Sequence, residues 1–141
     1  MNAMAISLKL DPSAAEIDQV LQPLVRFNWA THDTPQNFQP FILEFVGPSG
    51  DVVGGLVGMA EWDWLLLQYV FVPEALRGQG HGKALMRRAE DFARERGLLG
   101  VWSNMFGFQP VSFFEKLGYR IAATIEDHPK GSCRHIIRKR F

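Results

Sequence analysis

The chain has 141 residues, which suits one domain with a full hydrophobic core and leaves no room for a second catalytic lobe. Basic and acidic residues balance at 15 each, so no overall charge attracts nucleic acid or an anionic membrane. The single cysteine excludes an internal disulfide and a thiolate zinc cluster, which fits a cytoplasmic protein, and the four histidines lack the spacing of metal ligands. We therefore expect one domain over residues 1–141 that binds neither metal nor nucleic acid and does not enter the membrane.

The first part of the chain predicts a strand and then a helix. Residues 5–10 alternate apolar and polar side chains, which is the pattern of a half-buried strand. The helix begins either behind an Asp11 cap or through a capping box of Ser13 and Glu16. Its apolar positions recur at helical spacing, and Pro23 should kink or split it.

The rest of the chain predicts a sheet with two further helices. Two strands at residues 38–46 and 52–61 flank a loop rich in turn-forming residues. The strand at 65–72 is apolar on both alternating faces, so we expect both of its sides to be covered. The remaining predicted elements are a helix from Gly82 to Gly97, a strand at 98–103, a short helix at 111–117, and strands at 119–124 and 132–139.

The turn from Arg77 to Lys83 contains three glycines and leads directly into a helix that begins at Gly82. Glycines let the backbone approach a ligand closely and adopt angles that side chains forbid. The helix start adds unpaired N–H groups and about half a positive elementary charge, and Arg77 and Lys83 add full charges. This combination predicts a site for a phosphate or pyrophosphate group. The apolar side chains of that helix form one face, and its charged side chains, Glu90 among them, should face the solvent.

Neither of the two best-known phosphate motifs fits this turn. A P-loop would need a glycine at Arg77 and a serine or threonine at Ala84. The dinucleotide fingerprint would need a third glycine, which is missing in either alignment. What the turn does match is R-x-x-G-x-G, as Arg77, Gly80 and Gly82.

Together with the segments 106–109 and 113–119, this motif resembles that of the GCN5-related N-acetyltransferase (GNAT) family, whose acyl-CoA motif is Gln or Arg, two residues, Gly, one residue, then Gly or Ala. The resemblance is good from residue 52 to the C-terminus and weak before it. It implies an α/β (α+β) GNAT fold, a mixed and mostly antiparallel sheet of about six to seven strands with about four helices on both faces and a splayed central strand pair. Dimers are common in the family, so a homodimer is one expected state.

The resemblance implies an acetyl-CoA-dependent N-acetyltransferase that acts on a primary amine of an unidentified small molecule or protein. The residues implied at acetyl-CoA are Val70, Phe71, Val72, Arg77, Gly78, Gln79, Gly80, His81, Gly82, Lys83, Asn104, Phe113, Phe114 and Lys116. Among these, the backbone N–H of Val70 would polarise the thioester carbonyl. The residues expected at the acceptor are Asn28, Trp62, Trp64 and Phe106. The two tryptophans also fit an alternative in which they are buried aromatics at a sheet end.

Two departures from the family pattern leave the proton transfers open. Phe114 stands where most relatives have a tyrosine that protonates the departing thiolate, and Leu66 stands where the histone-modifying relatives have a catalytic glutamate. A water molecule can protonate the thiolate, since cysteine-like thiols titrate near about pH 8.5. The candidates for binding or activating the amine are Glu61, Asp63, Gln68 and His128. The same departures support an alternative function, a non-catalytic acyl-CoA-binding sensor or scaffold.

The last predicted strand carries a run of basic residues and the only cysteine. Residues 134–140 could bind nucleic acid, but short basic runs are more often solvated strand edges that discourage aggregation, and we expect the latter. Cys133 and His135 share a strand face and could form a nucleophilic pair. A lone strand cysteine more often serves packing, which we expect here.

Overall fold

The computed structural model describes residues 4–34 and 37–141. The chain separates into two compact units, Met1–Gln36 and Asn37–Phe141. The first unit contributes one helix, and the second contains the sheet and the remaining elements. None of the helices within the described ranges combines the length and the apolar character that a membrane span requires.

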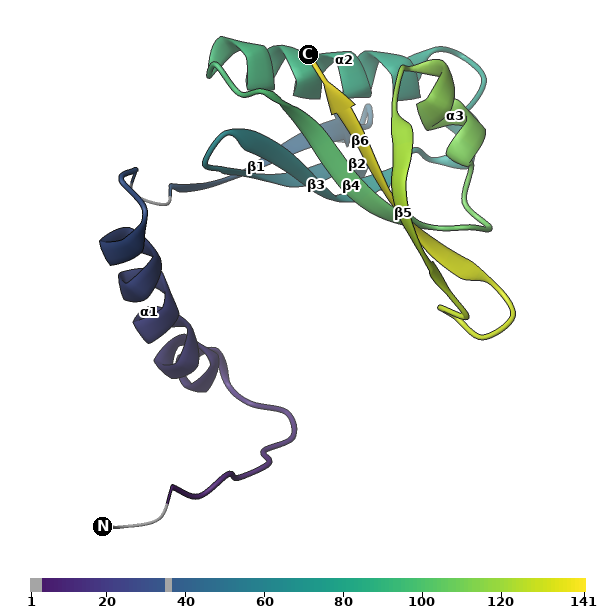
Figure 1. Ribbon diagram of the computed structural model, residues 1–141. Helices are drawn as coiled ribbons and strands as arrows, with labels where there is room; N and C mark the ends of the chain where they lie inside the picture. The colour runs from purple at the N-terminus through teal and green to yellow at the C-terminus, as the bar shows by residue number, and fades with distance from the viewer. Residues whose placement is uncertain (1–3, 35–36) are drawn as a thin grey trace. The chain divides into compact units, whose positions relative to one another are not determined.

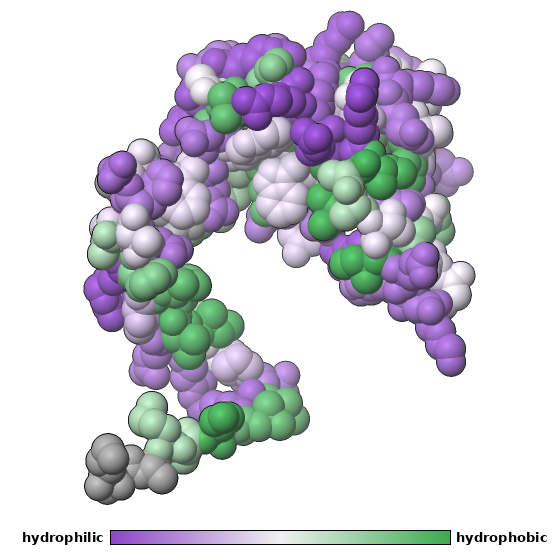
Figure 2. All heavy atoms as spheres, viewed as in Figure 1, coloured by the Kyte–Doolittle hydropathy of each residue, from purple (hydrophilic) through white to green (hydrophobic). Residues whose placement is uncertain are grey.

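Helix α1 (Ala14–Thr31) makes up half of the first unit, and Ser13 caps it. The Ser13 side chain accepts a hydrogen bond from the N–H of Glu16, whose carboxylate accepts one from the N–H of Ser13, so the capping-box start is confirmed. The helix runs unbroken through Pro23, so the predicted split does not occur. Its apolar side chains are exposed and gather along one side of the helix (Figure 2); they include Ile17, Val20, Leu21 and Leu24.

The predicted strand at residues 5–10 is wrong, because these residues form no strand. Alternating side chains create an apolar face, but a strand forms only where a neighbouring strand satisfies its backbone N–H and C=O groups. The described part of the first unit contains a helix and no strand with which this segment could pair. The apolar side chains of this segment, Ile6, Leu8 and Leu10, are exposed.

The second unit is built on a six-stranded mixed sheet with the order β1-β2-β3-β4-β6-β5 (Figure 1). The strands are β1 (Phe38–Val46), β2 (Val52–Glu61), β3 (Trp64–Phe71), β4 (Gly100–Phe106), β5 (Arg120–Glu126) and β6 (Cys133–Arg140). All neighbours run antiparallel except β3 and β4, which are parallel. A parallel pair needs a crossover connection, and the glycine-rich turn with the helix after it forms that connection.

The described ranges hold three α-helices, fewer than the four or so that the family resemblance implied. In the second unit, α2 (His81–Glu95) connects β3 to β4, and α3 (Val111–Lys116) connects β4 to β5. A short 3-10 helix, η1 (Glu74–Leu76), precedes α2. Both α2 and α3 lie on the same face of the sheet (Figure 1), where Phe113 and Phe114 pack against the core.

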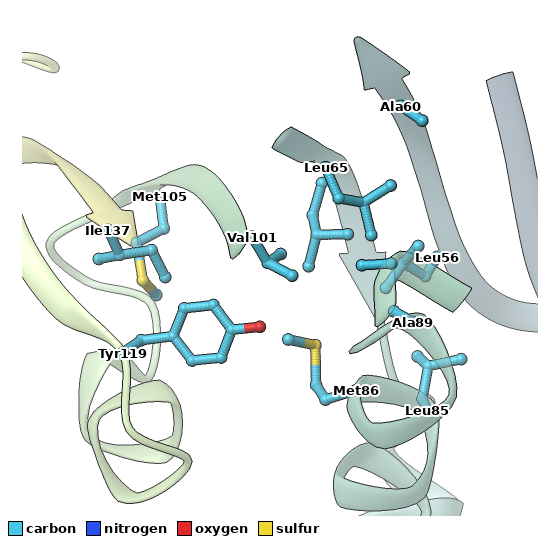
Figure 3. Close-up of a cluster of buried hydrophobic side chains, with 12 residues drawn as sticks. Leu56, Ala60, Leu65, Leu85, Met86, Ala89, Val101, Met105, Tyr119 and Ile137 are labelled. Atoms are coloured by element: carbon cyan, nitrogen blue, oxygen red, sulfur yellow. The ribbon is translucent and has the colours of Figure 1, made fainter. Parts of the chain in front are cut away.

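The hydrophobic core of the second unit lies between this sheet face and α2 (Figure 3). Its buried side chains are Leu56, Ala60, Leu65, Leu67, Leu85, Met86, Ala89, Ala93, Val101, Met105, Tyr119 and Ile137. Figure 3 shows the ring of Tyr119 extending into this cluster toward Met86. The apolar face predicted for α2 is therefore confirmed as the face that covers the sheet.

The opposite face of β3 is not covered within the second unit. Tyr69 is 72% exposed and Phe71 is 56% exposed, so the prediction that both sides of this strand are covered is wrong for the unit. The reason is that α2 and α3 lie on the same side of the sheet. An apolar residue pattern indicates which side chains can be buried. The positions of the connecting helices determine which face of the sheet is buried.

Glu90 of α2 lies in the core and not in the solvent, where its charge had led us to expect it. Only 5% of the surface of Glu90 is exposed. The Tyr119 hydroxyl donates to its carboxylate at 3.1 Å, the Lys139 ammonium at 2.9 and 3.0 Å, and the Arg94 guanidinium lies 3.5 Å away. A buried carboxylate is tolerated where it is paired and hydrogen-bonded in this way.

Strand β6 lies between β4 and β5, so the prediction that its basic residues form a solvated sheet edge is wrong. Lys139 points toward α2 and reaches Glu90, whereas Arg134 pairs with Phe106 of β4 on the other face. On the face of Lys139, Cys133 Sγ lies 3.4 Å from Nε2 of His135. The edge strand on this side is β5.

Candidate active site

The central strands β3 and β4 separate halfway along their length. Their parallel pairing runs from Trp64 opposite Gly100 to Leu67 opposite Ser103 and goes no further, although both strands continue. The Ser103 hydroxyl donates to the carbonyl of Leu67 at 2.7 Å and closes the paired part of the two strands. The expected splayed strand pair is therefore confirmed, and it leaves unpaired backbone along both sides of the gap.

Gln68 is an extra residue in β3 at the point where the strands separate. Its neighbours Leu67 and Tyr69 lie opposite Gly58 and Val57, which are adjacent in β2, so the register on that side passes over Gln68. The register with β4 has already ended at Leu67. A bulge of this kind leaves backbone groups out of the ladder and re-aims the following side chains, as is common beside active sites.

The gap between β3 and β4 widens into a cleft of about 1060 Å³. Its walls come from the second halves of β3 and β4, the glycine-rich turn, the loop before α3, α3 itself and β6. The lining residues are Gln68, Tyr69, Val70, Phe71, Val72, Arg77, Gly78, Gly80, Gly82, Lys83, Ser103, Asn104, Met105, Phe106, Phe108, Gln109, Pro110, Phe113, Phe114, Arg134 and Ile137. The lining of the cleft is thus mainly apolar and includes the positively charged glycine-rich turn.

Gly78 and Gly80 give the turn its shape. Their φ angles are +72° and +84°, a left-handed conformation that side chains rarely adopt. A Cβ added to either glycine would have no atom within 4 Å among the described residues, so neither is needed for packing. Both line the cleft, and the space beside them is therefore open to a ligand.

The start of α2 is aimed at the same space. Gly80 is its N-cap residue and offers no side-chain hydrogen bond; the first bond of the helix runs from the N–H of Ala84 to the carbonyl of Gly80 at 3.0 Å. The N–H groups before it are those that a helix start leaves unpaired. Arg77, whose Nε donates to the carbonyl of Val72 at 2.9 Å, and Lys83 also line the cleft. Unpaired N–H groups with two cations favour an anion such as a diphosphate.

Helix α3 closes the cleft beside this turn. An added Cβ at Gly82 would lie 3.2 Å from Cζ of Phe113, which is tighter than most such contacts. Phe113 packs edge-on against Phe114 at 5.1 Å between ring centres, and Phe114 packs against Tyr119 at 5.9 Å. The aromatic rings of α3 therefore hold the turn in place and form an apolar wall of the cleft.

Most residues predicted at acetyl-CoA lie together in this cleft. They are Val70, Phe71, Val72, Arg77, Gly78, Gly80, Gly82, Lys83, Asn104, Phe113 and Phe114. Gln79, His81 and Lys116 do not line it. Gln79 donates to the carbonyl of Ala75 at 2.7 Å, and the His81 ring lies edge-on to Phe45 at 6.2 Å.

Of the residues predicted to bind the acceptor or to activate its amine, some lie at the cleft and others lie far from it. Phe106 and Gln68 line the cleft, and His128 lies edge-on to Phe106 at 5.8 Å between ring centres. The turn between β2 and β3, at the start of β3, holds four other candidates: Glu61, Trp62, Asp63 and Trp64. The Trp64 ring packs over Gly100 there. At about 3.3 Å per residue, Trp64 and Val70 are roughly 20 Å apart along the strand. Asn28 lies on α1 in the first unit.

The two tyrosines have different surroundings. Tyr119 is 2% exposed, and its hydroxyl donates to Glu90, so burial and the neighbouring carboxylate raise the pKa of this phenol well above its usual range. That hydroxyl is committed to the core and does not line the cleft. Tyr69, in contrast, lines the cleft and is exposed.

Arg134, Phe108 and Gln109 line the cleft but were not among the predicted site residues. The basic pattern of residues 134–140 predicts a solvated strand edge for Arg134. The signal that could have found it is its spacing of five residues from Lys139, which puts the two cations on opposite faces of β6. That signal becomes informative only when the neighbours of β6 are known.

Two curated relatives align with this chain over about two thirds or more of both proteins. The chain is 40% identical over 94 residues to the blasticidin-S acetyltransferase of Streptomyces morookaense, an alignment that covers 66% of this chain and 69% of that protein. It is 30% identical over 132 residues to the acetyltransferase Atu2258 of Agrobacterium fabrum, which covers 93% of this chain and 96% of that protein.

Solved structures share the fold. A crystal structure of a protein from Agrobacterium tumefaciens matches with a TM-score of 0.90 at 29% identity, covering 98% of this chain and 100% of that chain. A Bacillus anthracis structure in complex with acetyl coenzyme A matches with a TM-score of 0.61 at 18% identity, covering 74% and 63% of the two chains. Residues 5–119 match the model of the acetyltransferase (GNAT) family. The chain is an acetyltransferase and belongs to the GNAT family.

Proposed function

We propose that this enzyme transfers an acetyl group from acetyl-CoA to a primary amine, with both substrates bound in the cleft at the same time and residues 1–141 acting as one catalytic domain. The observation that carries the proposal is that the splayed strands and the glycine-rich turn open into one cleft. The relative from Streptomyces morookaense, named for blasticidin-S, favours a small molecule as the acceptor over a protein.

The cleft has the features that acetyl-CoA needs at each end. The turn from Arg77 to Lys83 would hold the diphosphate, because the start of α2 and two cations converge there. Val70 to Val72 and the rings of Phe113 and Phe114 would line the pantetheine arm. When bound, acetyl-CoA supplies an activated acetyl group and a thiol as the leaving group.

The residues of the chain then orient the reactants and exclude water. We assign the backbone N–H of Val70 to the thioester carbonyl, where a fixed donor would stabilise the developing negative charge. The amide of Gln68, which lines the cleft at the bulge, would orient the amine by hydrogen bonding. Water molecules would carry the protons, because Phe114 has no hydroxyl at the position where most relatives have a tyrosine and the Tyr119 hydroxyl is committed to Glu90.

The direct test is the thermal unfolding midpoint of the purified protein with acetyl-CoA, CoA or ATP. A ligand present at about a hundred times its dissociation constant adds about 2.7 kcal/mol to the free energy of unfolding. We expect acetyl-CoA and CoA to raise the midpoint and ATP to leave it unchanged, followed by turnover on a panel of amines. If millimolar acetyl-CoA leaves the midpoint unchanged, the turn does not bind CoA.

A second prediction concerns the proton for the departing thiolate. Phe114 lines the cleft, and Phe114→Tyr would add a hydroxyl on this wall. We expect kcat to rise by roughly tenfold, which is less than the 10²–10⁴ typical of general acids, because a CoA-type thiol is already a good leaving group. The measurement is kcat at saturating substrates against pH. An unchanged kcat would mean that thiolate protonation does not limit the rate.

A further inference from the structure

Arg134 projects into the cleft from β6 and is held on three sides. Its Nε and Nη2 both donate to Oδ1 of Asn104, with 2.7 Å between Nε and Oδ1. Its Nη1 lies 3.4 Å from Nε2 of His128, and its guanidinium carbon lies 4.8 Å from the centre of the Phe106 ring. The guanidinium is therefore part-buried and fixed in position.

These contacts leave two N–H donors of Arg134 unused. A guanidinium has one N–H on Nε and two on each terminal nitrogen. Asn104 takes the donor on Nε and one on Nη2, and His128 takes one on Nη1. One N–H remains on each terminal nitrogen, and no described residue accepts either of them. A guanidinium that offers one N–H from each of its terminal nitrogens can bind both oxygens of a carboxylate.

The charge of Arg134 also has no counter-charge among the residues that the structure describes. Within the described ranges, none of the ion pairs involves Arg134. The described residues that line the cleft include three cations, Arg77, Lys83 and Arg134, and no aspartate or glutamate. Asn104 provides only a neutral dipole. A part-buried cation without a counter-charge is costly, so the arrangement favours an anion that arrives with a ligand.

Arg134 is separate from the glycine-rich turn, so the two positive regions would hold different groups. Lys139 reaches Glu90 on α2, and Arg134 lies an odd number of residues before it, so strand alternation places Arg134 on the sheet face opposite α2. The turn follows β3, and β6 is two strands away from β3, which is roughly 10 Å in a sheet. A diphosphate at the turn would therefore leave Arg134 free.

We propose that Arg134 binds a carboxylate of the acceptor, and that this enzyme acts on amines that also carry a carboxylate. The inference rests on the proposed acetyl transfer, since it assigns acetyl-CoA to the turn and the acceptor to the opposite face. Phe106 and Phe108 stack at 5.2 Å between ring centres beside the guanidinium. An apolar part of the acceptor next to its carboxylate would pack against these rings.

The test compares acceptors in pairs that differ by one charge. The probes are β-alanine, γ-aminobutyrate and L-phenylalanine, each beside its carboxamide. Each probe is given to the wild-type enzyme and to Arg134→Gln, and two quantities are measured: kcat/KM with acetyl-CoA, and the unfolding midpoint of the CoA-bound protein. Arg138→Gln is the matched control, because Arg138 is an exposed arginine on the same face of β6 that does not line the cleft.

We expect the wild-type enzyme to prefer the carboxylate form in at least one pair. In Arg134→Gln, kcat/KM for that form should fall roughly 10- to 100-fold, as expected for the loss of charged hydrogen bonds. In the same variant, kcat/KM for the carboxamides should change less than about threefold, and the shift of the unfolding midpoint caused by acetyl-CoA should equal that of the wild type. Arg138→Gln should behave like the wild type in both measurements.

Several outcomes would overturn the inference while the proposed function stands. One is equal use of carboxylates and carboxamides by the wild-type enzyme. Another is a loss in Arg134→Gln that falls on the KM of acetyl-CoA and not on the acceptor. A third is that acetyl-CoA binds but no carboxylate is turned over or raises the midpoint of the CoA-bound protein. If acetyl-CoA itself does not bind the wild type, it is the proposed function that fails.

Discussion

Replacing Gly80 by valine is expected to abolish acetyl-CoA binding while the protein remains folded. Gly80 has a φ of +84°, which a β-branched residue adopts only at a cost of about 1–3 kcal/mol. It is also the N-cap residue of α2, and its Cβ would project into open space beside the first N–H groups of the helix. The valine side chain would therefore occupy the place where the diphosphate is expected.

The measurement is the midpoint shift caused by acetyl-CoA. At about a hundred times the wild-type dissociation constant, the ligand should add about 2.7 kcal/mol to the wild type and close to nothing to Gly80→Val. Gly50→Val is the matched control, because Gly50 has a φ of +88° with no atom within 4 Å of an added Cβ, in the turn between β1 and β2. Gly50→Val should lose a similar free energy of unfolding through backbone strain, and acetyl-CoA should still raise its midpoint by the full wild-type amount.

These paired variants separate backbone strain from ligand exclusion. If both variants lose the shift equally, general destabilisation explains the result and the turn has no special role. If Gly80→Val binds acetyl-CoA with undiminished affinity, the assignment of the diphosphate to this turn is wrong.

Glu90→Ala is expected to lower the free energy of unfolding by about 3–5 kcal/mol, which is large for a helix residue that carries a charge. Its carboxylate binds the Lys139 ammonium at 2.9 Å and accepts from the buried Tyr119 hydroxyl. Removing it leaves both groups without their shared acceptor and leaves a cavity in the core. For a chain of this size, the unfolding midpoint should fall on the order of 10 °C.

Glu95→Ala on the same helix provides the control. Glu95 and Arg88 form an exposed pair with 3.5 Å between the charged atoms, and pairs of this kind contribute less than about 1 kcal/mol. Lys139→Ala should also be strongly destabilising, and the double variant Glu90→Ala with Lys139→Ala should cost less than the sum of the two single changes. Additive losses, or a Glu90→Ala midpoint equal to that of Glu95→Ala, would contradict the buried network.

The elements from residue 38 onward could be predicted from the sequence, most closely at the two strands Phe38–Val46 and Val52–Glu61, which match to the residue. Alternation, helical spacing and turn residues act over a few neighbours, so the sequence contains them directly. The segment at residues 5–10 shows where this fails: its alternation is as regular as that of a strand, but residues 4–34 of its unit contain no partner strand. Strand formation requires that partner, and sequence spacing cannot supply it.

The sequence by itself determined the glycine-rich turn and the helix after it, because the left-handed φ of Gly80 and the apolar spacing of α2 are properties of adjacent residues. It also carried the family resemblance through R-x-x-G-x-G. Only the tertiary structure decided that Glu90 is buried beside Lys139 and that Arg134 enters the cleft beside Asn104. These contacts join residues 30 to 49 positions apart, and they depend on β6 lying between β4 and β5. The order of strands in a sheet is a global property of the chain, and it decides which charges meet a partner and which face the substrate.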